Sequence, residues 1–147
     1  MSTPHPSIQM EEEMMFYDTD CGGVVHNIAY LRMIEKARTK LAANMGMALR
    51  EMASTRLFPV VVRTEIDYRK PAILGDFLQI HGKLTGLQGP RFWVEFTIHR
   101  NQPAELLITC RQSLALVQMP EGRPVRLPED WAKYWPDLVV KKSAAKE

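Results

Sequence analysis

The residues best suited to chemistry gather in one short stretch, Tyr17–Asn27. Asp18 and Asp20 flank one threonine. After Cys21 come two glycines, then two valines, and then His26. Glycines let a backbone turn sharply and approach a ligand closely. A carboxylate in such a turn can attack a carbonyl or activate water, while backbone N–H groups at a helix start hold the developing oxyanion. The stretch therefore indicates a compact reacting centre built on a carboxylate.

The same residues are open to plainer interpretations. The pattern Asp-x-Asp-x-Gly-Gly before a helix is also typical of a turn with capping carboxylates. Asp18, Asp20 and His26 could offer ligands to a metal, but nothing in their spacing shows that they converge, and we expect no metal. Cys21 could be a nucleophile, but the sequence identifies no partner to activate it. Spacing alone leaves capping and catalysis both open.

Hydrophobic periodicity predicts the elements that position this stretch. Five segments have strand character: 8–16, 60–68, 77–87, 91–100 and 106–119. A long amphipathic helix is predicted over 28–45, with Asn27 as its N-cap and Gly46 just beyond its C-cap. Shorter helices are predicted over 47–54 and 130–134. One long helix among antiparallel strands joined by tight turns indicates the α+β class.

Composition narrows the class of protein. A chain of 147 residues has the size of one domain, and we expect a single domain over 1–147 with a C-terminal extension from about residue 127. From Lys141 onward we expect disorder. The 19 Lys and Arg residues nearly balance 17 Asp and Glu and are mostly scattered, which argues against a nucleic-acid partner.

The expected location is the cytoplasm. No apolar run approaches the ~18 residues of a membrane-spanning helix, so we expect no integral membrane segment. The residues Met1–Pro6 lack the basic region and apolar stretch of a secretory signal. Cys21 and Cys110 have no metal-type spacing and fit free thiols in a reducing compartment.

A family resemblance accompanies this pattern. The segments that carry it are Tyr17–Val25, Tyr30–Arg32, Glu35–Arg38, Tyr68–Ala72 and Gly75–Asp76. Together they resemble the signature of the 4-hydroxybenzoyl-CoA thioesterase family, and most closely the bacterial acyl-CoA thioesterases associated with the Tol-Pal system. The resemblance extends from about residue 8 to 126.

The resemblance implies a hotdog fold, in which a curved antiparallel sheet wraps around one long helix. It implies hydrolysis of acyl-CoA thioesters to free acid and CoA, with no metal or other cofactor. It also implies homodimers or homotetramers with active sites at the subunit interface. The family's catalytic carboxylate corresponds to Asp20, acting as nucleophile or as general base on water, a choice that the sequence leaves open.

Residues near Asp20 are candidates for supporting roles. Many of the closest relatives carry a tyrosine and then a histidine after the two valines, whereas His26 and Asn27 stand at those positions here. The imidazole thus comes one residue early, and such a shift at a helix start turns a side chain by about 100°. Gly23 and Tyr30 are further supporting candidates, and Tyr30 also fits the helix core.

The sequence gives weaker guidance on the CoA site and on assembly. Candidate partners for the CoA phosphates are Arg63, Arg69, Lys70, Arg91 and Arg111, among which the sequence does not choose. One helix on one layer of sheet leaves a cleft incomplete, so we expect at least a homodimer joined through edge strands. Trp93, on an outward strand face, hints at a subunit contact.

Two alternatives to a thioesterase remain. One is a hotdog dehydratase or hydratase acting on an acyl thioester, which needs a general base such as His26. The other is a non-catalytic acyl-binding protein that kept the fold. The intact residues Asp20 to Gly23 argue against the second alternative.

Overall fold

The computed structural model describes residues 4–141 and places them in five long strands, three α-helices and short connecting turns. The first part of the chain contains β1 (Ser7–Glu13), a 3-10 turn (Phe16–Asp18), α1 (Asn27–Asn44) and α2 (Leu49–Thr55). The remaining elements are β2 (Leu57–Tyr68), β3 (Phe77–Gln88), β4 (Arg91–Asn101), β5 (Ala104–Gln118), β6 (Arg123–Pro124), α3 (Glu129–Tyr134) and a second 3-10 turn (Pro136–Leu138).

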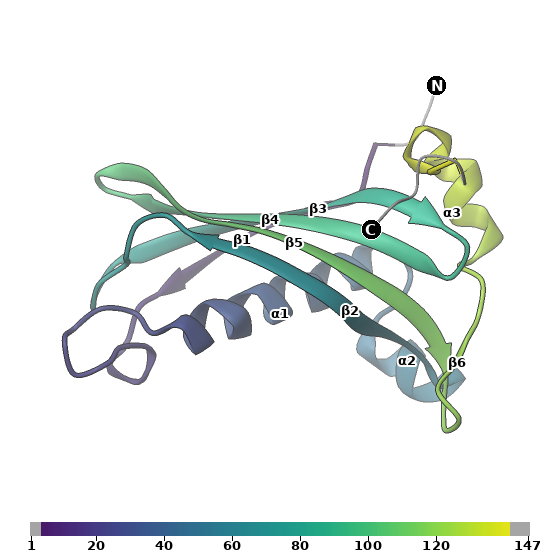
Figure 1. Ribbon diagram of the computed structural model, residues 1–147, viewed down its shortest axis with the longest axis horizontal. Helices are drawn as coiled ribbons and strands as arrows, with labels where there is room; N and C mark the ends of the chain where they lie inside the picture. Colours follow the sequence, from purple (N-terminus) through teal and green to yellow (C-terminus); the bar gives the residue numbers. More distant parts are fainter. Residues whose placement is uncertain (1–3, 142–147) are drawn as a thin grey trace.

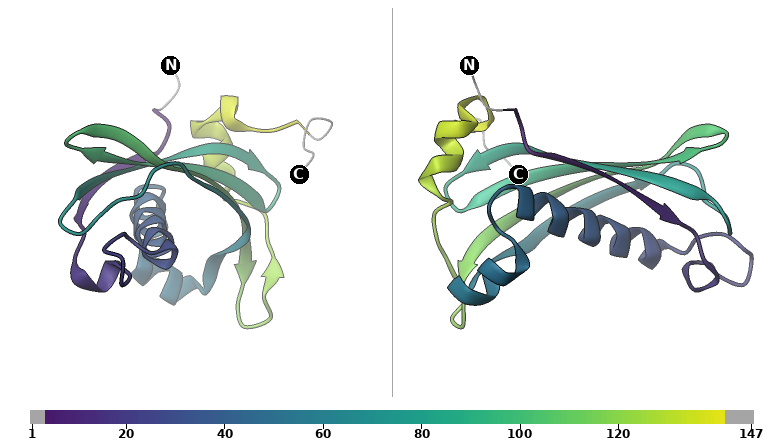
Figure 2. Two further views of the ribbon diagram at one scale, coloured as in Figure 1. Left: turned by 60° about the vertical axis from the view of Figure 1, so that its left-hand side comes forward. Right: turned by 180° about the vertical axis from the view of Figure 1, so that it is seen from behind.

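The strands form one antiparallel sheet in the order β1-β3-β4-β5-β2, with β6 paired to β5. This sheet curls over α1, which lies along its inner face (Figures 1 and 2). The predicted α+β class, with a curved antiparallel sheet around one long helix, is confirmed. The edges of the sheet are β1 on one side and β2 on the other.

The helix α1 buries one stripe of small and apolar residues against the sheet. The buried positions are Ala29, Tyr30, Met33, Ile34, Ala37 and Leu41, at helical spacing. Gly46 adopts φ of +90° just beyond the C-cap Met45, as predicted, because glycine tolerates the left-handed region. The predicted N-cap is wrong by one residue: the cap is His26, and Asn27 is the first residue inside the helix.

The inner face of the sheet completes the core. Leu78, Ile80, Phe96 and Ile98 from β3 and β4 are at most 1% exposed. Burying each such side chain contributes about 1.5–3 kcal/mol. The alternation predicted for these two strands is therefore confirmed, and the outward residues of β4 and β5 form the opposite face.

Two sequence expectations about exposure are wrong. The first strand ends at Glu13, and Phe16 lies in the 3-10 turn with its side chain 81% exposed. The chain bends there because the N–H and C=O of Met14 bond to Asp76 and Gly75. Trp93 is only 8% exposed: its ring and Val140 both approach Gly86, so the chain's own C-terminal segment covers this part of the outer face.

The two ends of α1 have different surroundings. The loop between β1 and α1 lies at one end of the molecule, while α2, β6 and α3 lie at the opposite end (Figure 1). In the part of the chain from 4 to 141, no helix is long and apolar enough to cross a membrane. The predicted disorder from Lys141 falls, beyond that residue, outside the described part of the chain.

Candidate active site

The loop of residues 14–26 closes on itself as a narrow hairpin. Thr19 and Val25 form an antiparallel bridge, and the Asp20 N–H donates to Val24 O at 2.9 Å. The Gly23 N–H donates to Asp20 O at 3.1 Å, with Gly23 at φ of +81°. This pairing returns the chain toward α1 and sets Asp20 against Val24, three residues before Asn27, the first residue of that helix.

Asp20 is exposed, but it is fixed by its own loop. Its Oδ1 accepts the N–H of Gly22 at 2.8 Å and that of Val24 at 3.4 Å. Among residues 4–141, no group donates to Oδ2. One carboxylate oxygen is therefore held in place while the other is available to a substrate or a water molecule.

Asp18 lies in the opposite environment, with 1% of its surface exposed. Its Oδ1 accepts from Arg32 Nη2 at 3.1 Å and its Oδ2 from the Met15 N–H at 3.0 Å. Its backbone oxygen accepts the His26 N–H at 3.0 Å. Asp18 therefore fastens the loop to α1, and the Arg32 partnership has no local signal because the two residues are 14 positions apart.

His26 caps α1 and uses both ring nitrogens to do so. Its Nδ1 accepts the Ala29 N–H at 3.1 Å, and its Nε2 lies 3.2 Å from Tyr17 O. A neutral imidazole has one donor and one acceptor nitrogen, so these contacts assign the proton to Nε2, which donates to Tyr17 O. Neither nitrogen is left to abstract a proton from a substrate.

The start of α1 offers open backbone donors. The first N–H groups of a helix have no partner within it and carry partial positive charge. Within residues 4–141, the N–H groups of Asn27 and Ile28 make no hydrogen bond, whereas that of His26 is used by Asp18. The Asn27 side chain is exposed. The helix start can therefore receive an oxyanion at Asn27 and Ile28.

Gly23 and Tyr30 join this loop to the turn between β2 and β3. The Leu74 N–H donates to Gly23 O at 3.2 Å, and the Ala72 N–H donates to the Tyr30 hydroxyl oxygen at 3.0 Å. Tyr30 is 3% exposed, and burial raises the pKa of its phenol. Gly23 thus links the loop, and Tyr30 links α1, to the same turn.

Arg100 fixes the 71–76 turn, a role that sequence reasoning missed. Its guanidinium donates to Asp76 Oδ2 and to Pro71 O at 3.1 Å each, and it also pairs with Glu105. These carboxylates raise its pKa, with the Asp76 hydrogen bond as the leading cause. No spacing rule connects the four positions, because the sheet alone brings them together.

The candidate CoA-binding residues fall into separate places. Arg69 and Lys70 directly precede the 71–76 turn and are exposed, with Lys70 3.7 Å from Glu105. Arg63 lies midway along β2, 3.4 Å from Glu65. Arg91 begins β4, nine residues and about 30 Å along the strand from Arg100. The structure brings only Arg69 and Lys70 to the Asp20 end of the same subunit.

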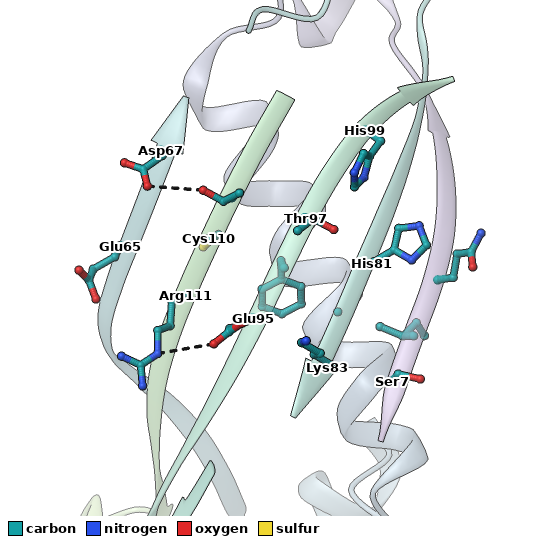
Figure 3. A pocket seen from close by; sticks show the side chains of 15 residues that line it. Ser7, Glu65, Asp67, His81, Lys83, Glu95, Thr97, His99, Cys110 and Arg111 are labelled. Atoms are coloured by element: carbon teal, nitrogen blue, oxygen red, sulfur yellow. Dashed lines mark hydrogen bonds and ion pairs between the residues drawn. The ribbon is translucent and has the colours of Figure 1, made fainter. Parts of the chain in front are cut away.

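A hollow of about 470 Å³ lies at the start of α1, lined by Ile28, Leu31 and Arg32 among others, and two further hollows lie away from the Asp20 loop. One, of about 690 Å³, is on the sheet face opposite α1, where Arg111 Nε lies 3.9 Å from Glu95 (Figure 3). The other, of about 250 Å³, lies beside α2. Neither is lined by a residue of the loop. In residues 4–141, no three His, Cys, Asp or Glu side chains gather in a way that could hold a metal ion.

Comparisons with known proteins show which family this chain resembles. Residues 14–135 match the model of the thioesterase-like superfamily. The chain is 33% identical over 136 residues to the 1,4-dihydroxy-2-naphthoyl-CoA hydrolase of Synechococcus elongatus, covering 88% of this chain and 97% of that protein. It is 28% identical over 116 residues to the acyl-CoA thioesterase YbgC of Haemophilus influenzae, covering 78% and 84%.

A solved structure supports the fold. The 4-hydroxybenzoyl-CoA thioesterase of Pseudomonas sp. strain CBS-3 superimposes with a TM-score of 0.80 at 18% identity, covering 88% of this chain and 99% of that chain. This likeness confirms the hotdog fold that the resemblance implied. With the family match spanning residues 14–135, the chain belongs to the thioesterase-like superfamily.

Proposed function

We propose that this protein hydrolyses acyl-CoA thioesters to a free acid and CoA, with Asp20 as the essential group. The observation that carries the proposal is the state of Asp20 in a chain of this family. Its Oδ1 is held by two N–H groups, its Oδ2 is open, and the start of α1 with unpartnered N–H groups follows directly.

The reaction needs a nucleophile and a place for negative charge. The thioester carbonyl carbon is attacked either by Asp20, giving an acyl anhydride that water then cleaves, or by water that Asp20 deprotonates. In both routes the C–S bond breaks and CoA leaves as the thiolate, which takes a proton from water in the first route and the proton that Asp20 removed from water in the second. The N–H groups of Asn27 and Ile28 hold the carbonyl oxygen as it becomes an oxyanion. Asn27 thus acts through its backbone.

The other residues act by position. His26 caps the helix that supplies the oxyanion donors, and Gly23 and Tyr30 fix the loop against the β2–β3 turn. Arg69 and Lys70 are the best placed to meet CoA phosphates from the same subunit. Arg63 and Arg91 would serve only a site that also includes a second subunit.

A second subunit completes this exposed site. We propose a dimer in which the β2 edges of two copies pair. β2 is 12 residues long, and its Val60, Val61 and Val62 are 41%, 42% and 46% exposed. A long apolar edge of this kind is a template for strand pairing. The other edge, β1, has seven residues and exposes Glu11 and Glu13. Sedimentation of a monomer alone at micromolar concentration contradicts this dimer.

The experiment that tests the activity is thiol release from a panel of aliphatic and hydroxyaryl acyl-CoAs. A hydrolase releases CoA thiol from at least one of them in proportion to enzyme. A dehydratase or hydratase alters the acyl chain and releases no thiol, and an acyl-binding protein does neither. The bonding of both His26 nitrogens favours hydrolysis over dehydration. A cytoplasmic location and a Tol-Pal association remain predictions.

A further inference from the structure

The turn of residues 71–76 forms the surface against which the end of the loop before α1 is docked. The Val25 N–H donates to Ala72 O at 2.9 Å, and the Leu74 N–H donates to Gly23 O at 3.2 Å. Both bonds join backbone to backbone, so they fix the spacing between the two segments directly. A displacement of the turn therefore displaces the loop as well.

Val24 is the residue through which the turn reaches Asp20. It forms an antiparallel bridge with Ile73 of the turn. Its N–H lies 3.4 Å from Asp20 Oδ1, and its backbone oxygen accepts the Asp20 N–H at 2.9 Å. The turn and Asp20 thus contact the same residue from two sides. The position of Val24 therefore sets where the carboxylate stands relative to the start of α1.

Arg100 of β4 binds the turn at both of its ends. Its Nη1 donates to Pro71 O and to Asp76 Oδ2 at 3.1 Å each, and its Nη2 pairs with Glu105 of β5. The side chains of Arg100 and Asp76 are each 14% exposed. Ion pairs that are so well covered are screened by salt much less than exposed pairs are. Arg100 therefore fastens both ends of the turn to the sheet.

Asp76 carries the effect of Arg100 into the middle of the turn. Its Oδ2, which accepts from Arg100, also accepts the Ile73 N–H at 3.0 Å. The guanidinium is a planar fork whose donors fix the direction of their partners, whereas a lysine offers only a point charge. Without Arg100, the Asp76 carboxylate loses its cation and is free to turn toward water. That movement releases the Ile73 N–H, and Ile73 is the residue that bridges Val24.

We propose that Arg100 is a positioning residue for Asp20, acting through the 71–76 turn and Val24. The inference rests on the proposed hydrolase function. It does not depend on the dimer, because every contact in the series lies within one subunit. A reacting group displaced by about 1 Å by a distant change can lose a factor of ~10² in rate. The effect of removing Arg100 should therefore appear in kcat, although Arg100 touches neither Asp20 nor the start of α1.

The positioning role is tested first with Arg100→Met, which keeps a stem of similar length and removes the guanidinium. Measured as thiol release at saturating acyl-CoA, kcat should fall about 10- to 100-fold. Saturation keeps changes in CoA binding near Lys70, which shares Glu105 with Arg100, out of the comparison. If Arg100→Met does not fold, Arg100→Lys replaces it, because a lysine keeps the charge but lacks the fork. A kcat within about twofold of the wild type overturns the proposal.

A control variant separates positioning from a general loss of stability. Trp135 lies at the end of α3, at the opposite end of the molecule from the loop (Figure 1). Trp135→Phe removes the indole N–H that donates to Pro4 O at 3.1 Å. Its kcat should stay within about twofold of the wild-type value, since distant sites act independently. A loss of kcat as large as that of Arg100→Met would reduce the effect to destabilisation and overturn the proposal.

The route through Asp20 is tested with the double variant Asp20→Asn/Arg100→Met. Groups that act as a unit have effects on rate that do not add. Once the carboxylate is gone, Arg100→Met should lower the remaining kcat by less than about threefold. A larger loss in the Asp20→Asn background would mean that Arg100 acts on the reaction independently of Asp20, which overturns the route.

Amide hydrogen exchange tests the structural link without a substrate. In Arg100→Met, the N–H groups of Ile73, Leu74 and Val25 should exchange about tenfold faster or more, whereas that of Ala37, inside α1, should keep its wild-type rate. Unchanged exchange at the first three overturns the positioning role even if kcat falls. Absence of thiol release by the wild type overturns the proposed function instead, and faster exchange at these amides would still support the link from Arg100 to the loop.

Discussion

The loop that precedes α1 has two sides with opposite properties, although they alternate along a few residues. On the inner side, Asp18 is 1% exposed, and its two carboxylate oxygens accept hydrogen bonds from the Arg32 guanidinium and the Met15 N–H. On the outer side, Asp20 is exposed, with one oxygen bound by its own loop and one open. The difference shows that two aspartates in one motif can have separate roles. Asp18 holds the loop in place, and Asp20 is proposed to act on the substrate.

The largest expected effect follows from changing the outer side. Asp20→Asn keeps an Oδ1 that can accept from Gly22 and Val24, so the loop should keep its shape. It removes the group that attacks or deprotonates. We expect the rate of acyl-CoA hydrolysis to fall by ~10² to 10⁴, measured as thiol release, with a melting temperature close to that of the wild type. Near-full hydrolysis by Asp20→Asn would mean that the aspartate only shapes the turn.

Changing the inner side should affect stability more than rate. Asp18→Asn removes a buried charge that accepts two hydrogen bonds, and charge-assisted bonds contribute about 2 kcal/mol to folding. For a domain of this size the melting temperature should fall by roughly 4–8 °C. Hydrolysis at 25 °C should stay within about tenfold of the wild-type rate. A loss of turnover as large as that of Asp20→Asn, in a protein that is still folded, would remove the distinction between the two sides.

His26 offers a finer test of the comparison between the two sides of the loop. It belongs to the inner side, because its side chain caps α1. His26→Ala should cost about 1 kcal/mol in the free energy of unfolding, since the Ala29 N–H loses its acceptor. His26→Asn, which supplies a good N-cap, should restore most of that stability. Denaturant unfolding of the two variants checks the cap. Hydrolysis should follow the same order, because His26 acts through the helix start; loss of turnover in both variants would point to a proton-transfer role instead.

Changing the cysteines should have the smallest effect on activity and stability. Their reactivity reports directly how exposed each thiol is in the folded protein. Cys21 lies on the outer side of the loop, whereas Cys110 is buried, and burial raises the pKa of its thiol to about 11. At pH 8 that thiol stays protonated and covered. A thiol-specific reagent should therefore modify one cysteine per folded chain and both after denaturation, and Cys21→Ser should abolish the fast reaction. Rapid modification of Cys110 in the folded protein would contradict this burial.

The sequence allowed prediction of the class, the sheet and the long helix, because alternation and helical spacing report which faces are buried. It also singled out the loop, because two carboxylates, two glycines and a histidine are gathered there directly before the long helix. Spacing alone could not separate Asp18 from Asp20, and only the family resemblance pointed to Asp20, since Arg32 meets Asp18 only after α1 forms. The N-cap was misplaced by one residue for a related reason: Asn is the commoner cap, but the contact with Tyr17 selects His26.

Long-range contacts account for the other differences. Trp93 was expected on an outward face, and only the folded C-terminal segment covers it. Arg100 holds the 71–76 turn through residues that lie 24 and 29 positions away, which no local pattern reveals. Arg69, Lys70 and Arg91 look equivalent in the sequence, yet the sheet places Arg91 at the opposite end from the other two.

The central claim is that Asp20 performs the chemistry and does not merely shape the loop. The most direct test is calorimetric titration of the Asp20→Asn variant with an acyl-CoA that the wild type hydrolyses, followed by analysis of the recovered ligand. The account predicts binding with an affinity within a few-fold of the wild-type KM, and recovery of the thioester intact. Loss of binding to the same extent as loss of turnover, or recovery of free CoA, would contradict it.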